Sequence, residues 1–326
     1  MRVMVTGAGG FLGRLLVQRL LERGTLRGQP LDTLVLLDQK LDGFAQDPRL
    51  RLLAGSITDP ALQRRALADG ADVVFHLVSI PGGAAEQQYG LGHQVNLLAS
   101  LELLDQLRRC ARPPVLVYAS SVAVYGAELP ARMDEQLAPR PVLSYGAHKL
   151  MVETQLSDLA RRGEVDGRAL RLPGIVARPR EPNGLRSAFM SDLMHALAAG
   201  QAYECPVSSQ ASAWWMSAHC CLDNLLHAAE LDNPGESRVW QLPVLHLSIG
   251  QVVDALVGAF GEDRRALVNY RPDAELERLF GRYPSLRTPQ ARALGFRHDG
   301  SALALVRNAL NLNQRPRRLR AAPQTA

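Results

Sequence analysis

The feature that most limits the fold of this chain is a glycine-rich turn between its first apolar run and its first amphipathic stretch. The run Arg2–Thr6 predicts a strand, and the pattern of Phe11–Arg23 predicts a helix that ends near Gly24. The turn between them has a GxxGxxG spacing, with its glycines at Gly7, Gly10 and Gly13. Glycine there allows a tight turn, a close approach of the backbone to a phosphate, and close packing of the helix on the strand. The free N–H groups at the start of this helix, which includes Phe11 and Leu12, complete a predicted dinucleotide site.

Short apolar runs alternate with amphipathic stretches through the first half of the chain. Five more strands are predicted, at Thr33–Asp38, Leu50–Leu53, Val73–Leu77, Val115–Ser120 and Arg168–Leu172. Helices are predicted between them, at Pro60–Ala68, Tyr89–Ala111 and Ser144–Arg161. The strands are apolar throughout rather than at alternate residues, so we expect them to be buried on both faces. This pattern is typical of an α/β fold with a Rossmann-type, doubly wound parallel sheet.

The regular alternation ends after Pro179. Residues 1–177 are therefore predicted to form an NAD-binding domain, to which a later segment near 215–245 returns. Residues 178–312 are predicted to form a smaller, mostly helical C-terminal substrate lobe, with helices at Ser187–Ala199, Ala218–Leu231, Ser248–Phe260, Ala274–Phe280, Thr288–Leu294 and Ser301–Leu312. Residues 313–326 are expected to be a basic, disordered tail.

Charge and hydropathy narrow the possible partners. The net charge is +5, but four positive charges belong to the tail, which leaves +1 for the rest: Arg315, Arg317, Arg318 and Arg320. Such a body is a poor partner for nucleic acid. No apolar run approaches the roughly 20 residues that a membrane span needs. Because the chain opens directly on a strand, with no targeting segment before it, we expect a cytoplasmic protein.

Cysteine and histidine patterns give no sign of a metal site. The four cysteines form no CxxC pair and are expected to be reduced thiols: Cys110, Cys205, Cys220 and Cys221. The eight histidines have no ligand spacing. His76, at the end of an apolar strand, is interpreted as a structural histidine rather than a metal ligand.

An acidic residue ends the second strand and indicates which cofactor is preferred. Asp38 lies 25 residues after Gly13, where a carboxylate can accept hydrogen bonds from the adenosine ribose and repel a 2′-phosphate. NAD is therefore predicted rather than NADP. Lys40, close by, is the one residue that favours NADP.

A YxxxK pattern supplies the predicted catalytic pair, Tyr145 and Lys149. Residues four apart share a helix face, so that the phenol and the ammonium can enter the same cleft. A nearby cation lowers the pKa of a phenol toward neutrality and makes it a usable general base. The chain has seven tyrosines and only two lysines, so a chance match is rare. Ser121, at the carboxyl end of a strand, is predicted to hold a substrate oxygen.

Together these motifs resemble the extended short-chain dehydrogenases, the NAD-dependent epimerase/dehydratase family, over about residues 1–310. The resemblance also rests on Gly55-Ser-Ile-Thr-Asp59, His76-Leu-Val-Ser79, Ser120-Ser121, Tyr125-Gly126 and Arg171-Leu-Pro173. It implies that Tyr145 and Lys149 touch the nicotinamide ribose. It implies cofactor contacts at further positions, namely Ser56 and Ile57 beside the adenine, Leu77, Ser79 and Asn96 along the cofactor, and Pro173 beside the nicotinamide amide. It also implies a homodimer formed through the helices at 89–111 and 144–161.

Within that family the chain is most similar to dehydrogenases of small sugar acids. The expected reaction is the NAD-dependent oxidation of a 2-hydroxy acid to a 2-keto acid. A carboxylate substrate needs a polar clamp, and the candidates are Arg178, Asn183 and Arg186. Ser212-Ala213 stands where a basic residue is expected, so another group must hold the carboxylate or the substrate differs.

Two other functions stay open. One is a nucleotide-sugar 4-epimerase that keeps its NAD bound, although Gly174 stands where many epimerases have Asn. The other is a non-catalytic dinucleotide-binding sensor, which the presence of both Tyr145 and Lys149 disfavours. A dehydratase is set aside because Val122-Ala123 replaces the expected acid pair.

Overall fold

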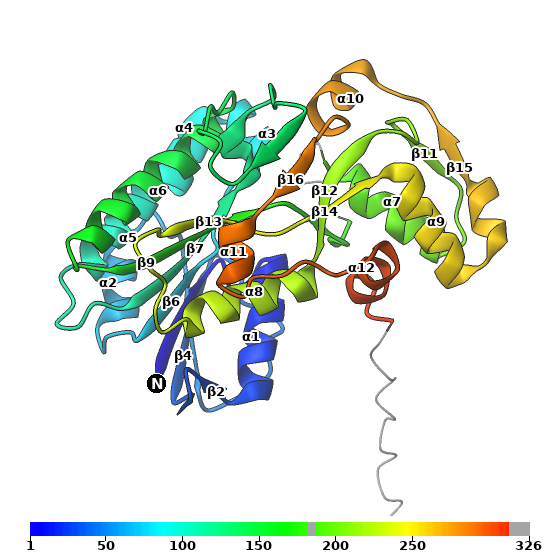
Figure 1. Cartoon of the computed structure of the whole chain (residues 1–326). Helices are drawn as coiled ribbons and strands as arrows, with labels where there is room; N and C mark the ends of the chain where they lie inside the picture. The colour runs from blue at the N-terminus through cyan, green and yellow to red at the C-terminus, as the bar shows by residue number, and fades with distance from the viewer. Residues whose placement is uncertain (181–186, 313–326) are drawn as a thin grey trace, which may run out of the picture.

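The computed structural model describes residues 1–180 and 187–312, and a seven-stranded parallel sheet lies at its centre (Figure 1). The strand order is β13-β9-β7-β6-β1-β4-β5. The strands are β1 (Arg2–Thr6), β4 (Thr33–Asp38), β5 (Leu50–Ala54), β6 (Val73–His76), β7 (Val115–Ser121), β9 (Asp166–Leu172) and β13 (Val239–Gln241). All six predicted strands are present, with ends that differ by at most two residues. The order reverses direction between β1 and β6, which is where ligands bind in such sheets.

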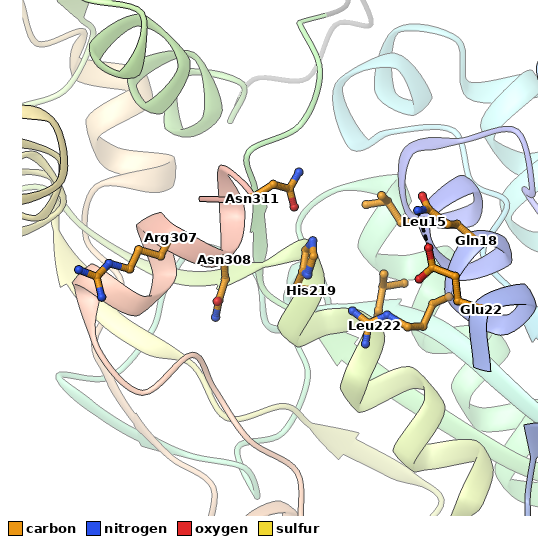
Figure 2. A pocket seen from close by; sticks show the side chains of 9 residues that line it. Leu15, Gln18, Glu22, His219, Leu222, Arg307, Asn308 and Asn311 are labelled. Atoms are coloured by element: carbon orange, nitrogen blue, oxygen red, sulfur yellow. Dashed lines mark hydrogen bonds between the residues drawn. The ribbon is translucent and has the colours of Figure 1, made fainter. Parts of the chain in front are cut away.

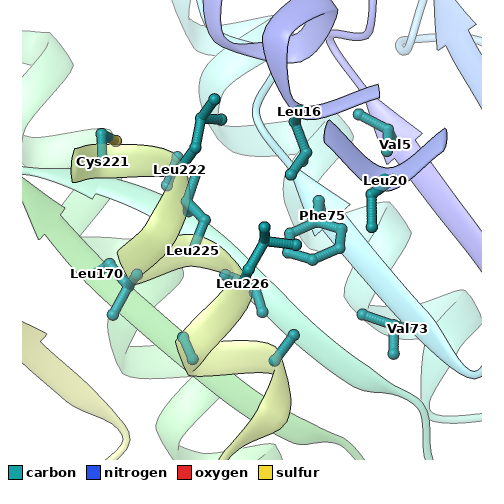
Figure 3. Packing of buried hydrophobic residues seen from close by; sticks show 14 of the residues in the cluster. Val5, Leu16, Leu20, Val73, Phe75, Leu170, Cys221, Leu222, Leu225 and Leu226 are labelled. Atoms are coloured by element: carbon teal, nitrogen blue, oxygen red, sulfur yellow. The ribbon is translucent and has the colours of Figure 1, made fainter. Parts of the chain in front are cut away.

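Alternate residues of the strands face two separate helical layers. On one face Val5, Phe75 and Leu170 pack against α1 (Phe11–Arg23) and α8 (Ala218–Glu230), as Figure 3 shows. On the other face residues such as Met4 and Val74 pack against α2, α5 and α6. These helices span Pro60–Leu67, Ala99–Leu107 and Ser144–Arg161. The sheet is therefore the middle layer of three, the doubly wound arrangement that the sequence predicted.

One strand departs from the expected burial. We predicted that every strand of the sheet is buried on both faces, but β5 is largely exposed and Leu52 keeps 48% of its surface accessible. The reason is position, because β5 is the last strand at its edge of the sheet. An apolar run alone does not reveal whether a strand lies at an edge.

The helix predicted at Tyr89–Ala111 is divided into three parts. It begins as α4 (Tyr89–Gly92), continues as a π-helical segment over His93–Leu98, and ends as α5 at Leu107. A further short helix, α3 (Gly82–Gln87), was not predicted. Its sequence has no apolar repeat from which a helix could be inferred. Gly82 in this helix lies against the Tyr145 side chain.

A second lobe is built on a small sheet with its own core. The sheet has the order β10-β12-β14, from Gly174–Val176, Ser212–Ser217 and Leu245–Ser248. Helices α7 (Phe189–Ala198), α9 (Ile249–Phe260) and α12 (Ala302–Ala309) pack around Trp215 and Leu256 in this core. Helix α10 (Ala274–Phe280), the short helix at Glu262–Leu267 and the pair β11 (Tyr203–Cys205) and β15 (Val268–Tyr270) complete the lobe.

Chain segments cross between the two lobes more than once. Helix α8 packs on the main sheet and β13 pairs with β9. Helix α11 (Pro289–Ala293) also contributes to the main core through Ala291, and Phe296 follows it there. Two small strand pairs lie outside the main sheet, β2 (Thr25–Leu26) with β3 (Gln29–Pro30), and β8 (Arg132–Asp134) with β16 (Ser285–Arg287).

Two predictions fall outside the described residues. They are the clamp candidates Asn183 and Arg186, and the tail 313–326. Across residues 1–180 and 187–312, none of the helices is both long and apolar enough to cross a membrane.

Candidate functional site

The glycine-rich turn after β1 is shaped by steric limits that the structure makes explicit. Gly7 has a φ of 72°, and its N–H donates to the Leu37 carbonyl oxygen at 2.9 Å. A Cβ atom on Gly13 would overlap the Gly7 carbonyl oxygen. Gly9 is equally restricted, since a Cβ there would overlap the Lys40 carbonyl oxygen, yet the GxxGxxG spacing does not single it out. Gly10 is exposed, and the Gly7 carbonyl oxygen, at 3.3 Å, is the one atom within the described residues that comes within 4 Å of an added Cβ, so a ligand can approach this backbone.

The first turn of α1 is able to hold phosphate. Gly10 precedes the helix, and no side chain within the described parts of the chain caps it. The first N–H groups of such a helix, including those of Phe11 and Leu12, lack partners inside the helix. Arg14 fixes the turn from behind, because its Nε donates to the Gly9 carbonyl oxygen and its Nη1 to that of Asp42, each at 2.8 Å. An open backbone at Gly10 beside free N–H groups fits a pyrophosphate.

Asp38 lies at the tip of β4, beside this turn. Its Oδ2 accepts from the Gly9 N–H at 2.9 Å and its Oδ1 from the Gln39 N–H at 2.6 Å. Each carboxylate oxygen can accept more than one hydrogen bond, so ribose hydroxyls can still be bound. The carboxylate thus links the phosphate turn to the expected position of the adenosine ribose.

Residues after β5 and β6 line the same edge of the sheet. The Ser56 and Thr58 hydroxyls are 2.8 Å apart, while the Ile57 side chain is buried in the core, so Ile57 has only its backbone to offer an adenine ring. Leu77 is partly buried at the end of β6. Pro173 is buried directly after β9.

Asn96 holds the loop that carries Ser79. Its Oδ1 accepts from the Ile80 N–H at 2.7 Å and its Nδ2 donates to the Ile80 carbonyl oxygen at 3.0 Å. The Ser79 hydroxyl also donates to Asn96 Oδ1, at 3.1 Å. Asn96 thus fixes the loop that carries Ser79, and its direct contact with the cofactor stays a prediction.

His76 has a structural role, as predicted. Its Nδ1 is 2.6 Å from the Thr6 hydroxyl and its Nε2 is 2.9 Å from the Ser100 hydroxyl. Burial, with a smaller effect of Lys149, lowers its pKa to about 3. The ring therefore stays neutral, with both nitrogens used.

Tyr145 and Lys149 lie on one face at the start of α6. The Lys149 ammonium is buried, donates to the Ala119 carbonyl oxygen at 2.7 Å, and lies 5.6 Å from the centre of the Tyr145 ring. Burial lowers the pKa of Lys149 to about 7, and the nearby Glu153 carboxylate opposes that effect. Near neutral pH the Lys149 amine is therefore only partly protonated, and it lies beside the phenol ring.

Three groups converge on the Tyr145 hydroxyl. The pKa of Tyr145 is raised above its usual value because burial outweighs the opposing effects of the Arg178 charge and of the Ser79 and Ser121 hydroxyls. The lowering toward neutrality that we predicted from Lys149 is therefore not seen in this structure. Ser121 is itself fixed, because its Oγ accepts from the Ala123 N–H at 3.1 Å. The structure thus brings together Ser121, Tyr145 and Lys149, and the charge of Arg178, the predicted clamp residue that lies within the described residues, also acts on this site.

A buried ion pair beneath this site was not predicted. Glu153, one helical turn beyond Lys149, pairs with Arg171 on β9 at 2.7 Å and accepts from the Ser120 hydroxyl at 2.5 Å. Arg171 also donates to the Tyr125 hydroxyl at 2.9 Å. The sequence signal was a Glu at the next i+4 position after Tyr145 and Lys149, on the buried face of the helix.

Ser212 and Ala213 are occupied with the second lobe. The Ser212 hydroxyl donates to the Tyr283 carbonyl oxygen at 2.8 Å, and Ala213 is buried in the lobe's core. A separate groove lies between α1, α8 and the end of α12, lined by residues that include Gln18, His219 and Asn308 (Figure 2). Of the predicted site residues that the structure describes, none lines this groove.

Comparison with known proteins identifies the family of this chain. The profile of the NAD dependent epimerase/dehydratase family matches residues 3–220. The chain belongs to this family. It is accordingly an NAD-dependent oxidoreductase of the extended short-chain dehydrogenase type.

Three proteins illustrate the family relationship. D-erythronate dehydrogenase of Cupriavidus necator is 38% identical over 314 residues, which cover 94% of this chain and 97% of that protein. D-erythronate dehydrogenase of Haemophilus influenzae is 32% identical, with coverages of 92% and 96%. The crystal structure of a nucleoside-diphosphate-sugar epimerase from Agrobacterium tumefaciens superposes with a TM-score of 0.86 at 31% identity, covering 94% of this chain and 92% of that one.

Proposed function

We propose that this protein is a dehydrogenase that oxidises the 2-hydroxyl of a small sugar acid such as D-erythronate to the 2-keto acid, with NAD as the oxidant. The observation that carries the proposal is a partly buried Arg178, whose Nε donates to the Ile175 carbonyl oxygen at 3.1 Å and whose charge lowers the pKa of Tyr145, so that the guanidinium and the phenol serve one site. A cation next to the proton-accepting oxygen suits a substrate whose carboxylate is bonded to the carbon that reacts. Two relatives that match nearly the whole chain carry the name D-erythronate dehydrogenase.

In the proposed mechanism Tyr145 is the general base. Ser121 donates a hydrogen bond to the substrate hydroxyl oxygen, and Tyr145 as phenolate accepts the proton of that hydroxyl. The Arg178 charge favours the phenolate against the effect of burial, and the protonated form of Lys149 would add to this. Bound NAD would supply the acceptor for the hydride that leaves the carbon bearing this hydroxyl. Loss of one proton and one hydride converts the secondary alcohol into a ketone.

The cofactor site would be formed by the phosphate turn and Asp38. Gly10 and the N–H groups of Phe11 and Leu12 would bind the pyrophosphate, and Asp38 would accept from the ribose hydroxyls. Ser56, Ile57, Leu77 and Ser79 would lie along the cofactor, with Pro173 near the nicotinamide end. The Asp38 carboxylate would repel a 2′-phosphate, which favours NAD over NADP.

A nucleotide-sugar epimerase is the second candidate. It is favoured by the match to the Agrobacterium tumefaciens protein, whose title names a nucleoside-diphosphate-sugar epimerase. An epimerase returns the hydride to the same substrate and releases no net NADH. This difference gives a simple test.

We also propose a homodimer formed through the helical segments at 89–111 and 144–161. Six exposed large apolar side chains lie on or just before these helices: Tyr89, Leu91, Leu98, Val142, Leu143 and Met151. Scattered apolar residues are normal on a surface, but a cluster of this kind usually marks a contact with another protein. Leu98→Glu combined with Met151→Glu should give a monomer in light scattering after size exclusion. Leu52→Glu, at the exposed edge strand, is the matched control and should leave the dimer intact.

The experiment that tests the proposed reaction is a substrate panel followed by NADH absorbance. The panel holds four- to six-carbon aldonic and uronic acids, neutral sugars of the same length, and UDP-sugars. Net NADH formation with hydroxy acids, and little with neutral sugars, is expected. Interconversion of UDP-sugars without net NADH, and no activity toward hydroxy acids, would reject the dehydrogenase and favour the epimerase.

A further inference from the structure

Arg178 lies in a loop, where regular structure does not fix its backbone. It follows β10 by two residues and belongs to no helix or strand. Buried or partly buried backbone N–H and C=O groups need partners from elsewhere. In this protein both partners come from side chains of a single helix, α7.

Ser191 and His195 are those partners. The Arg178 N–H donates to the Ser191 hydroxyl oxygen at 3.1 Å, and the His195 Nε2 donates to the Arg178 carbonyl oxygen at 2.8 Å. The two residues are four apart, so they lie on one face of α7. A third contact reinforces the attachment, since Arg180 forms an ion pair with Asp192 at 3.6 Å.

Helix α7 is a rigid support for this loop. Phe189, Met190 and Leu193 are buried in the core of the second lobe. From this anchored backbone the Arg178 side chain turns back, and its Nε donates to the Ile175 carbonyl oxygen at 3.1 Å. Among the described residues, no hydrogen-bond partner is found for the two terminal nitrogens of Arg178. They are the pair that can bind both oxygens of a carboxylate.

We propose that Ser191 and His195 are positioning residues, which hold the main chain of Arg178 so that its guanidinium is directed into the site of Tyr145 and selects substrates with a carboxylate next to the reacting carbon. This inference rests on the proposed function and deepens it. A bidentate contact tolerates little displacement, because productive geometry must be kept within about half an ångström. Loss of either side-chain bond should therefore weaken capture of the acid more than the chemical step.

Kinetics of single variants provide the first test. Arg178→Ala should raise KM for D-erythronate about 10- to 100-fold, the effect of losing a charge-assisted hydrogen bond. His195→Ala should raise the same KM about 5- to 20-fold, with kcat and the KM for NAD changed less than about threefold. His195→Gln keeps a donor and should recover most of the loss.

The matched control is His227→Ala. His227 on α8 also donates through Nε2 to a backbone carbonyl oxygen, that of Leu294 at 2.7 Å. Its removal costs the fold the same kind of bond, but should leave KM for the acid unchanged. Equal effects of His195→Ala and His227→Ala would mean that His195 serves only stability.

A double-mutant cycle separates action through Arg178 from a general effect. If His195 acts through Arg178, adding His195→Ala to Arg178→Ala should raise KM no further. Ser191→Ala should behave in the same way. Additive effects on KM would overturn the inference.

A structural arm needs no substrate. In crystal structures, the Arg178 guanidinium should lie beside the Tyr145 hydroxyl in the wild type and be displaced in His195→Ala. An unmoved guanidinium would overturn the positioning role. If the wild type oxidises no hydroxy acid, the proposed function fails, and this structural arm alone decides whether α7 positions Arg178.

Discussion

Glu153 and Arg171 form a buried ion pair beneath the predicted catalytic helix, with Glu153 Oε2 2.7 Å from Arg171 Nη2. Their two side chains are 2% and 10% exposed, so neither charge is hydrated as it would be at the surface. Burial tends to lower the pKa of Arg171, but its bonds to Glu153 raise it, and the net pKa is above the usual value. The pair connects α6, which carries Tyr145 and Lys149, to β9 of the main sheet.

Removing one charge of this pair should destabilise the fold. Glu153→Gln would leave the Arg171 cation buried without compensation, and we expect the free energy of unfolding to fall by about 3–5 kcal/mol. Urea denaturation measures this change. In the control Glu230→Gln, which breaks a more exposed pair with Arg23, the change should stay below about 1 kcal/mol.

The double variant Glu153→Gln with Arg171→Met checks the reason for the loss. Removing both charges leaves no unpaired ion, so much of the stability should return. A double variant that is as unstable as the sum of the single ones would contradict this explanation and point to packing instead.

Tyr145→Phe should reduce kcat about 10²- to 10⁴-fold, the usual contribution of a general base. Phe keeps the ring against Gly82 and Lys149, so NAD should still bind, with only the small loss expected from one missing hydroxyl contact with the ribose. Steady-state rates with the best substrate of the panel, together with an NAD titration, measure both quantities. Tyr270→Phe, on β15 of the second lobe, is the control. If Tyr145→Phe kept more than about a tenth of the activity, Tyr145 would not be the base.

Asp38→Asn should reduce the preference for NAD over NADP. Asn can still accept the Gly9 N–H bond that shapes the turn, but it carries no charge to repel a 2′-phosphate. Dissociation constants for both cofactors measure the change, and the gap should narrow by about tenfold, the effect of roughly 1.4 kcal/mol. The control is Asp42→Asn. Asp42 is exposed and binds Arg14 through its backbone carbonyl oxygen, so this change should not alter the preference for NAD over NADP. A wild type that binds NADP as tightly as NAD would contradict the role of Asp38.

Local patterns were enough to predict the tight glycine turn after β1 and the shared helix face of Tyr145 and Lys149. The residues concerned lie in or next to the helix or strand that positions them: Gly7, Gly13, Tyr145 and Lys149. Their spacing in the sequence was therefore enough to predict their arrangement. The place of Arg178 could not be derived in this way, because it depends on how the loop after β10 packs on α7, a contact between distant segments.

Other features could not be predicted because they depend on steric contacts between distant residues or on the order of the strands in the sheet. Gly9 is required by the Lys40 carbonyl oxygen in the loop after β4, and no spacing rule includes it. The exposure of β5 depends on its place at the edge, which follows from the strand order rather than from its own residues. The sequence also gave no way to learn that Asn96 would bind the Ile80 backbone.

The buried His76 predicts how stability changes with acid. Its pKa is about 3 in the folded protein, against a usual value of 6.5, because burial disfavours the charged ring. Below about pH 6.5 the unfolded chain therefore takes up a proton that the folded protein does not. Stability should fall as the pH drops from about 6.5 toward 3, by up to about 1.4 kcal/mol per pH unit from this one group.

Urea denaturation at pH 7, 6 and 5 tests this effect. Most carboxyl groups titrate below this range, so they contribute little to the change in stability. His148 and His298 also have lowered pKa values, mainly through burial, and add to the wild-type slope in the same direction.

Comparison with His76→Gln isolates the contribution of His76. This variant should be less stable at pH 7, because two buried hydroxyls lose their partner, yet it should lose less stability between pH 7 and pH 5. His246→Gln, at an exposed histidine, should keep the wild-type slope. An unchanged slope in His76→Gln would mean that His76 is protonated in the folded protein near neutral pH, and that the bonds to Thr6 and Ser100 do not require a neutral ring.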